Sequence, residues 1–260
     1  MNKRLWCVFT GLCGLLMLAT CATPSGAQTT EVKEKPPMYS YVANWQIPRA
    51  HWAEMEAFNA AHQAIMDKAL ADGTLVGYGN DENRVHQPDT ETHDTWWSSM
   101  SMAGLMKVLD QQMASGNAAP SVLDTATKHW DSIYLSRYYN WKSGAYKGGY
   151  VHVSVYKVKA DAPDDAVATL SKNLIVPLME KMLADGAIVE YEVDEQAIHT
   201  SAPGTFVLVY VTPTAEGLDK VSAGLMAAVK AQPLAGPAFG SMTDDSGHRD
   251  ELEKGDGVFK

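Results

Sequence analysis

The chain repeats itself at a constant distance of 113 residues (181 − 68 = 113). Lys68-Ala-Leu-Ala-Asp-Gly73 recurs as Lys181-Met-Leu-Ala-Asp-Gly186. At the same offset, and without a gap, Tyr78 matches Tyr191 and Gly104-Leu105 matches Gly217-Leu218. Matches that extend this far indicate a duplication, so the chain is expected to fold as two copies of one unit.

The two copies allow the secondary structure to be read twice. In the second copy, Tyr150–Val158 alternates between valines and polar or aromatic residues, which predicts a strand. Asp161-Ala-Pro163 predicts a helix start, Gly186 predicts its end, and Pro177 predicts a kink near Ile175. Two strands and a helix follow, over Ala187–Val193, Thr205–Thr212 and Glu216–Ala231. The first copy predicts the same order over Met38–Trp45, His51–Ala71, Thr74–Asn80, His93–Ser101 and Ala103–Ala114.

The order strand, helix, strand, strand, helix is that of a ferredoxin-like unit. Two such units in one chain resemble the dimeric α/β-barrel superfamily in fused form. The resemblance implies an α+β fold in which two tandem ferredoxin-like βαββα repeats form one pseudo-dimeric barrel, with helices outside. Because each chain then contains both halves, a monomer is sufficient for the barrel. The predicted repeats cover 38–116 and 150–250.

The remaining segments have other expected roles. A basic start, the apolar run Leu5–Ala19 and the small residues Ser25-Gly26-Ala27 predict a signal peptide over 1–27, hence an exported, periplasmic or secreted protein. Leu18-Ala19-Thr20-Cys21 resembles a lipobox, so a lipid anchor at Cys21 is the alternative. We expect a polar tether over 28–37, an aromatic-rich linker over 117–149 with a short helix near Ser121–Tyr134, and a flexible tail over 251–260.

Composition excludes several classes of function. All three cysteines (Cys7, Cys13 and Cys21) lie in the signal region, so a chain cleaved after Ala27 has no thiolate nucleophile and no cysteine-bound metal. The net charge is −10 and no basic stripe is present, which argues against a nucleic-acid partner.

The candidate pocket follows from strand parity. If the valine face of the Tyr150 strand packs on helices, then His152, Ser154 and Tyr156 face the barrel interior. Their counterparts Tyr39 and Tyr41, together with Trp45, then form an aromatic surface opposite. We expect a pocket for a small apolar or aromatic molecule, with His152 as the candidate catalytic base. The alternative is a hydrogen-bonded core histidine.

Trp96 and Trp97 are adjacent in a predicted strand, so one should face the barrel and the other the helices. An inward tryptophan would form a flat wall for a planar ligand.

No metal site is predicted. His86 and His199 are equivalent in the two copies, but neither belongs to a His-x-His or His-x-x-x-His spacing. The acidic pairs Asp81-Glu82 and Asp194-Glu195 are interpreted as structural turns or as edge charges that prevent aggregation.

Three functions remain open. The resemblance implies a cofactor-independent enzyme, such as a monooxygenase or isomerase, with no cofactor predicted. Fused barrels also include the chlorite dismutase family, which implies haem as an alternative, with His152, His93 and Arg137 as candidates. The third hypothesis is a non-catalytic envelope binding or scaffold protein. The sequence leaves open whether the protein is an enzyme.

Overall fold

A computed structural model describes residues 32–115 and 122–260. The predicted signal peptide, its cleavage site and Cys21 lie outside the described residues. Among the residues that are described, no helix has both the length and the apolar character needed to cross a membrane.

The first repeat contains four strands and two long helices. These are β1 (Met38–Gln46), α1 (Trp52–Ala71), β2 (Gly77–Asn83), β3 (His93–Ser99), α2 (Met102–Ala114) and β4 (Lys128–Trp141), with short 3-10 turns at Arg49–His51 and Val122–Thr125. Gly73 ends α1 with a φ of 79°, and the equivalent Gly186 ends the second repeat's helix with a φ of 73°. The left-handed backbone at both positions explains why both copies keep glycine there.

The second repeat has the same order with one added helix. Its elements are β5 (Gly144–Lys157), α3 (Ala166–Leu170), a π-helical turn (Ser171–Ile175), α4 (Val176–Ala184), β6 (Glu190–Gln196), β7 (Thr205–Thr212), α5 (Ala215–Ala231), α6 (Ala235–Met242), a 3-10 turn (Asp245–Gly247) and β8 (Arg249–Phe259). The π-helical turn interrupts the helix at Ile175, directly before Pro177, as the proline predicts.

The eight strands close into one antiparallel barrel in the order β1-β3-β2-β8-β5-β7-β6-β4. Each repeat supplies four neighbouring strands. At the two junctions the second strand of one repeat pairs with the last strand of the other, β2 with β8 and β6 with β4. The expected fused ferredoxin-like architecture is therefore confirmed, and both junctions are made within one chain.

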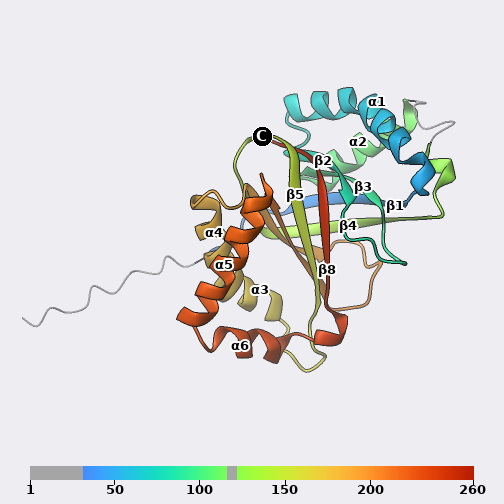
Figure 1. Ribbon diagram of the computed structural model, residues 1–260. Helices are drawn as coiled ribbons and strands as arrows, with labels where there is room; N and C mark the ends of the chain where they lie inside the picture. The colour runs from blue at the N-terminus through green and yellow to red at the C-terminus, as the bar shows by residue number, and fades with distance from the viewer. Residues whose placement is uncertain (1–31, 116–121) are drawn as a thin grey trace, which may run out of the picture. The chain divides into compact units, whose positions relative to one another are not determined.

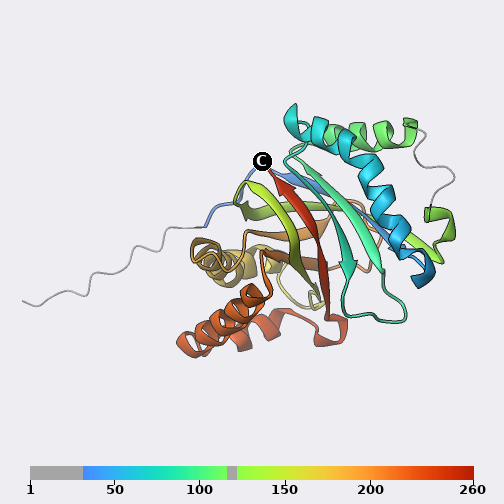
Figure 2. The same ribbon diagram turned by 45° about the horizontal axis from the view of Figure 1, so that its top comes forward.

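The helices cover the barrel in two separate groups. Figures 1 and 2 show α1 and α2 together over the strands of the first repeat, and α3–α6 over those of the second. Each group has its own core against the sheet. Leu75, Trp97 and Leu105 are fully buried in the first, and Met179, Ile188 and Phe206 in the second.

The structure expected for the linker over 117–149 is wrong. Only a short 3-10 turn, Val122–Thr125, forms at the start of the range expected to be helical; from Lys128 this segment is the 14-residue strand β4, which continues through a tight connection into β5. Its closely spaced aromatic residues are β-formers, and β1 offers them a free edge.

The ends of the folded part also differ from expectation. The expected flexible tail is β8, which pairs with both β2 and β5. Its glycines and charges gave it the composition of a frayed end, but Arg249, Glu251 and Glu253 line the barrel interior. In the expected tether, Val32 packs against the second core and Lys35 N–H donates to the Arg137 carbonyl at 2.8 Å. From Val32 onward, the described part of this segment therefore packs against the barrel and its helices.

Candidate functional site

Three cavities lie along the sheet. The first is the barrel interior, about 300 Å³. The second, about 440 Å³, lies between the sheet of the first repeat and its helices α1 and α2. The third, about 430 Å³, lies between the sheet and helices of the second repeat. All three are within the range of small-molecule sites.

The predicted assignment of strand side chains to the barrel interior or to the helices is wrong. Val153 and Val155 line the barrel interior, together with Ser40 and Val42 of β1. Tyr41, Trp45 and Tyr156 instead line the cavities under the helices. These strands are covered on both faces, so apolar character does not identify the helix-facing side. Long tyrosines suit that side because their hydroxyls reach the helices, as Tyr78 does to Asp67 of α1.

The cavity of the first repeat, which we call the α1 pocket, has an aromatic wall. Tyr41 and Trp97 stack with ring centroids 4.4 Å apart and an interplanar angle of 13°. Beside them, Trp45 stacks on His129 at 3.6 Å. All four residues line the pocket, so a planar molecule meets flat rings on the sheet side.

Two polar atoms in the α1 pocket are buried and have no hydrogen-bond partner in the described part of the chain. These are the donor Nε1 of Trp45 and the acceptor Oδ1 of Asn59. A buried polar group without a partner costs about 1–3 kcal/mol, so such atoms call for an explanation. A ligand that brings one acceptor and one donor would satisfy both.

His62 adds a titratable group to the same pocket. Its Nδ1 lies 2.9 Å from the Phe58 carbonyl oxygen, one turn earlier in α1. Because a carbonyl only accepts, Nδ1 carries the proton and Nε2 has a free lone pair. His62 is 7 % exposed and lines the pocket. Burial and the neighbouring Asp131 raise the pKa of the Tyr41 phenol, which therefore stays neutral.

The equivalent cavity of the second repeat lacks the histidine. At the offset of 113 residues, His62 corresponds to Ile175 and Gln112 to Leu225, while Met66 corresponds to Met179. These residues line the two cavities in the same way. The duplication has therefore produced one pocket with a histidine in its lining and one with an isoleucine in its place.

His152 lies outside all three cavities. Its ring stacks on Tyr210 at 4.9 Å, Ser154 Oγ is 3.3 Å from its Nδ1, and Asp250 is 4.0 Å from its Nε2. Burial lowers the pKa of this imidazole. His152, Ser154 and Tyr156 lie together as expected of one strand face, but that face is directed away from the barrel interior.

The other predicted site residues lie on different faces of the sheet. Trp96 faces the barrel and Trp97 the α1 pocket, while Tyr39 packs beside that pocket's core without lining it. The residues considered as haem ligands do not lie around a common cavity. His93 packs against Trp52, Arg137 lies near Glu34 and Glu195, and neither lines one of these cavities.

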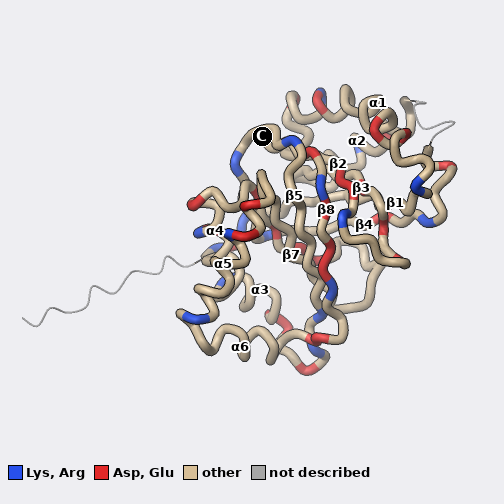
Figure 3. Tube along the Cα trace, viewed as in Figure 1, with Lys and Arg blue, Asp and Glu red and all other residues tan. Residues whose placement is uncertain are grey.

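The barrel interior has a property that the sequence did not predict. Only one basic side chain of the described residues, Arg249, lines it, and it is paired with Glu251 at 2.8 Å. Nine acidic side chains also line it: Asp81, Glu91, Asp94, Asp131, Glu190, Glu192, Asp194, Glu251 and Glu253. Figure 3 shows acidic positions along β8 and on neighbouring strands. The alternation Glu190-x-Glu192-x-Asp194 could have revealed this face.

Burial dominates the electrostatics of these carboxyls. Desolvation raises the pKa of Asp81 to about 7, although the hydrogen bond from Trp96 acts in the opposite direction. Desolvation likewise raises the pKa of Glu192 to about 7. The pKa values of Asp94, Glu190, Asp194 and Glu253 are raised further by burial and by neighbouring carboxylates. Metal-ligating side chains in the described chain gather only here, as Asp81-Asp94-Glu253 and Glu91-Glu251-Glu253.

This arrangement defines a dimeric α/β-barrel fold with both halves in one chain, and solved structures share it. One is a "putative monooxygenase" from Lactobacillus acidophilus, with a TM-score of 0.60 and 10% identity over 85% of this chain and 94% of that one. Another "putative monooxygenase", from Fusobacterium nucleatum, has a TM-score of 0.56 and 9% identity over 87% and 94%. An anthrone oxidase-like protein has a TM-score of 0.50 and 9% identity over 85% and 92%.

At these identities the similarity extends to the fold alone. No family model matches the sequence. No curated protein matches it either.

Proposed function

We propose that the α1 pocket binds a small planar, aromatic molecule that carries a hydroxyl or carbonyl group, and that the protein acts on it by proton transfer without an organic cofactor. The observation that carries this proposal is the pair of buried, unpartnered atoms Trp45 Nε1 and Asn59 Oδ1 in an aromatic pocket. A ligand carbonyl accepts from Trp45, and a ligand hydroxyl donates to Asn59.

His62 is the proposed general base in place of His152. Its free Nε2 can take a proton from a phenol or from an acidic C–H group of the bound molecule. Return of that proton to another carbon completes an isomerisation. A monooxygenase-type reaction needs O₂ as the oxidant: a methylene becomes a carbonyl with one oxygen atom, and the other leaves as water with the two methylene hydrogens.

The difference between the repeats supports a single specialised site. An aliphatic residue, Ile175, occupies the position of His62 in the second cavity, and Leu225 occupies that of Gln112. The fold shared with proteins described as monooxygenases is consistent with this chemistry. The signal sequence adds the proposal that the protein acts after export, either released or lipidated at Cys21.

Binding is tested by calorimetry with 2-naphthol and with naphthalene, which has the same rings and no hydroxyl. We expect 2-naphthol to bind more tightly. Trp45→Phe and Asn59→Leu should each weaken its binding by about fivefold, since each removes one hydrogen bond worth about 1 kcal/mol. Naphthalene binding should change little.

Proton abstraction is tested by the exchange of the methylene protons of anthrone in D₂O, followed by NMR. His62→Ile introduces the residue of the second repeat and should lower enzyme-dependent exchange by about 100-fold or more. His152→Ala is the matched control and should exchange like wild type. Equal loss in both variants, or no acceleration by wild type, contradicts the proposed base. If wild type binds 2-naphthol but does not accelerate the exchange of anthrone protons, the result supports a binding protein rather than an enzyme.

A further inference from the structure

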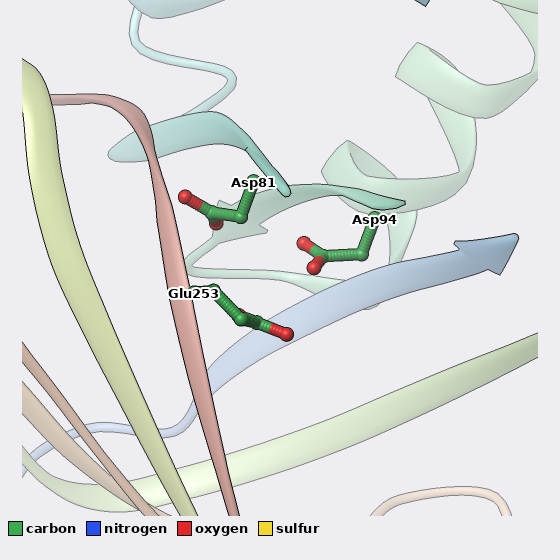
Figure 4. Close-up of side chains that lie close together, drawn as sticks. All are labelled: Asp81, Asp94 and Glu253. Carbon is green, nitrogen blue, oxygen red and sulfur yellow. The ribbon is translucent and has the colours of Figure 1, made fainter. Parts of the chain in front are cut away.

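Three acidic side chains meet inside the barrel, away from the α1 pocket. Asp81 of β2 and Asp94 of β3 are directly opposite each other in the antiparallel ladder, and Glu253 comes from β8 on the other side of β2. One oxygen from each residue lies within 4.8 Å of the others. Figure 4 shows the three side chains close together, with the Asp94 and Glu253 carboxylates approaching each other and that of Asp81 turned toward β8.

All three residues are buried, with exposed fractions of 5 % for Asp81 and 4 % for Asp94 and Glu253. Like charges opposite each other in a sheet are destabilising, and burial makes the repulsion stronger. Arg249, the basic residue of the described chain that lines the barrel interior, is already bound to Glu251. The sheet therefore brings three acids together and supplies no cation of its own to them.

One atom of this cluster points to a ligand. Asp94 Oδ2 is buried and has no hydrogen-bond partner among the described residues. The acids of β6 differ in this respect, since Ser136 donates to Asp194 and both Ser136 and Ser40 lie 3.4 Å from Glu192. A buried carboxylate oxygen without a donor is satisfied by a cation or by a proton.

The surroundings of Asp81 are shaped to hold its carboxylate in place. Trp96 Nε1 donates to Asp81 Oδ2 at 2.8 Å, which leaves Oδ1 available. On β8, a Cβ at position 255 would lie 2.1 Å from Asp81 Oδ1, so only glycine gives the carboxylate its space. Such an orienting hydrogen bond to a ligating carboxylate is a usual feature of metal sites.

We propose that Asp81, Asp94 and Glu253 form a binding site for a single hard divalent cation, of the Ca²⁺, Mn²⁺ or Mg²⁺ class. The donor set consists only of carboxylate oxygens, which these ions prefer, whereas Zn²⁺ and Cu²⁺ favour imidazole and thiolate ligands. With Asp81 Oδ2 held by Trp96, the three carboxylates leave up to five oxygens, and water would complete the ~6–8 that Ca²⁺ takes. Glu91 and Glu251, which share Glu253 in a second acidic group, add negative charge around the ion.

Binding of the cation removes the repulsion that the fold otherwise retains. Burial and then the neighbouring acids raise the pKa of Asp94 and of Glu253, which shows that the fold disfavours their charged forms. Protons compete with a cation for these oxygens, so binding is expected to be weaker in acid.

The test is calorimetric titration of the purified, chelator-treated protein with CaCl₂, MnCl₂ and MgCl₂ near neutral pH. We expect saturable binding of one ion per chain for at least one of the three. Asp94→Asn keeps the shape of the side chain and should weaken binding by at least about tenfold, more than loss of an outer-shell partner. Asp194→Asn is the matched control, because Asp194 is the equivalent of Asp81 in the second repeat, and should change the affinity by less than about twofold.

Thermal unfolding provides a second readout that separates lost binding from lost folding. In chelator, Asp94→Asn should unfold at or above the wild-type temperature, because a buried repulsion has been removed. The cation should raise the unfolding temperature of wild type and of Asp194→Asn, but not that of Asp94→Asn. The proposal is overturned if wild type binds none of the three ions, if Asp94→Asn binds like wild type, or if Asp194→Asn loses binding equally.

Discussion

The indole Nε1 of Trp96 donates a 2.8 Å hydrogen bond to Oδ2 of Asp81 inside the barrel. Trp96 lies opposite Gly79 of β2, which in turn pairs with Gly257 of β8. Because neither glycine has a side chain, the indole can lie flat across these strands. One hydrogen bond thus links the aromatic part of the barrel interior to its acidic part.

Gly79→Ala tests this close packing. A Cβ at this position would lie 2.5 Å from Trp96 Cζ2, so the ring must move. We expect a loss of about 1–3 kcal/mol in the free energy of unfolding, measured with urea. Gly236→Ala in α6 is the control, since its Cβ would have no neighbour within 4 Å and alanine favours a helix. Equal destabilisation of both variants would contradict the packing of Trp96.

Removal of residues 249–260 tests the role of β8. Without this strand, β2 and β5 both lose a partner, and the barrel opens along two edges. We expect the shortened protein to lose cooperative thermal unfolding and to aggregate. Addition of a synthetic peptide of residues 248–260 should restore the transition. A shortened protein that unfolds like the full chain would show that the segment is a dispensable tail.

The acidic face of β6 predicts an unusual pH dependence. Burial, and then Glu192 and Asp194, raise the pKa of Glu190 well above its usual value. The folded state therefore binds a proton that the unfolded state releases, so stability is greatest in acid and falls as the pH rises past the usual carboxyl range. Glu190→Gln is permanently neutral. It should match wild type at about pH 3, below the usual carboxyl pKa, and exceed its free energy of unfolding by more than about 1 kcal/mol at about pH 8.

Glu195→Gln is the control for this prediction. Glu195 is on the same strand, but its side chain is half exposed and lies 4.0 Å from Arg137. Its replacement should leave the difference in stability between the two pH values almost unchanged. If Glu190→Gln shows the wild-type pH profile, Glu190 does not hold a proton in the fold.

The closed barrel also predicts the state of assembly. Both junctions, β2 with β8 and β4 with β6, are formed within one chain. We therefore expect a monomer in native mass spectrometry, with unfolding that does not depend on protein concentration. A stable dimer, or a transition temperature that rises with concentration, would contradict this expectation.

The duplication made the fold predictable, because a pattern that occurs twice identifies elements that one copy alone would leave ambiguous. The exceptions have physical reasons. In β8, the glycines and charges of Glu251–Gly257 looked like a frayed end, although the glycines give space to Trp96 and Asp81. In β4, the crowded aromatics were interpreted as a linker, but pairing with β1 makes this segment a strand.

The site was less predictable because it depends on which face of each strand points inward. Strand alternation pointed to His152, while the unpartnered atoms of Trp45 and Asn59 appear only in three dimensions. No motif in the sequence marks His62. Asp81 and Asp194, which both copies retain, were interpreted as part of structural turns or as edge charges, yet both line the barrel interior.

The most direct test of the proposed function is a crystal structure of the protein with a brominated 2-naphthol, in which the anomalous signal of bromine locates the ligand. The predicted result is one site in the cavity between α1 and the sheet of the first repeat, with the naphthol hydroxyl bonded to Trp45 or Asn59 and the ring near His62. A ligand found only in the barrel interior or in the equivalent cavity of the second repeat would contradict the assignment.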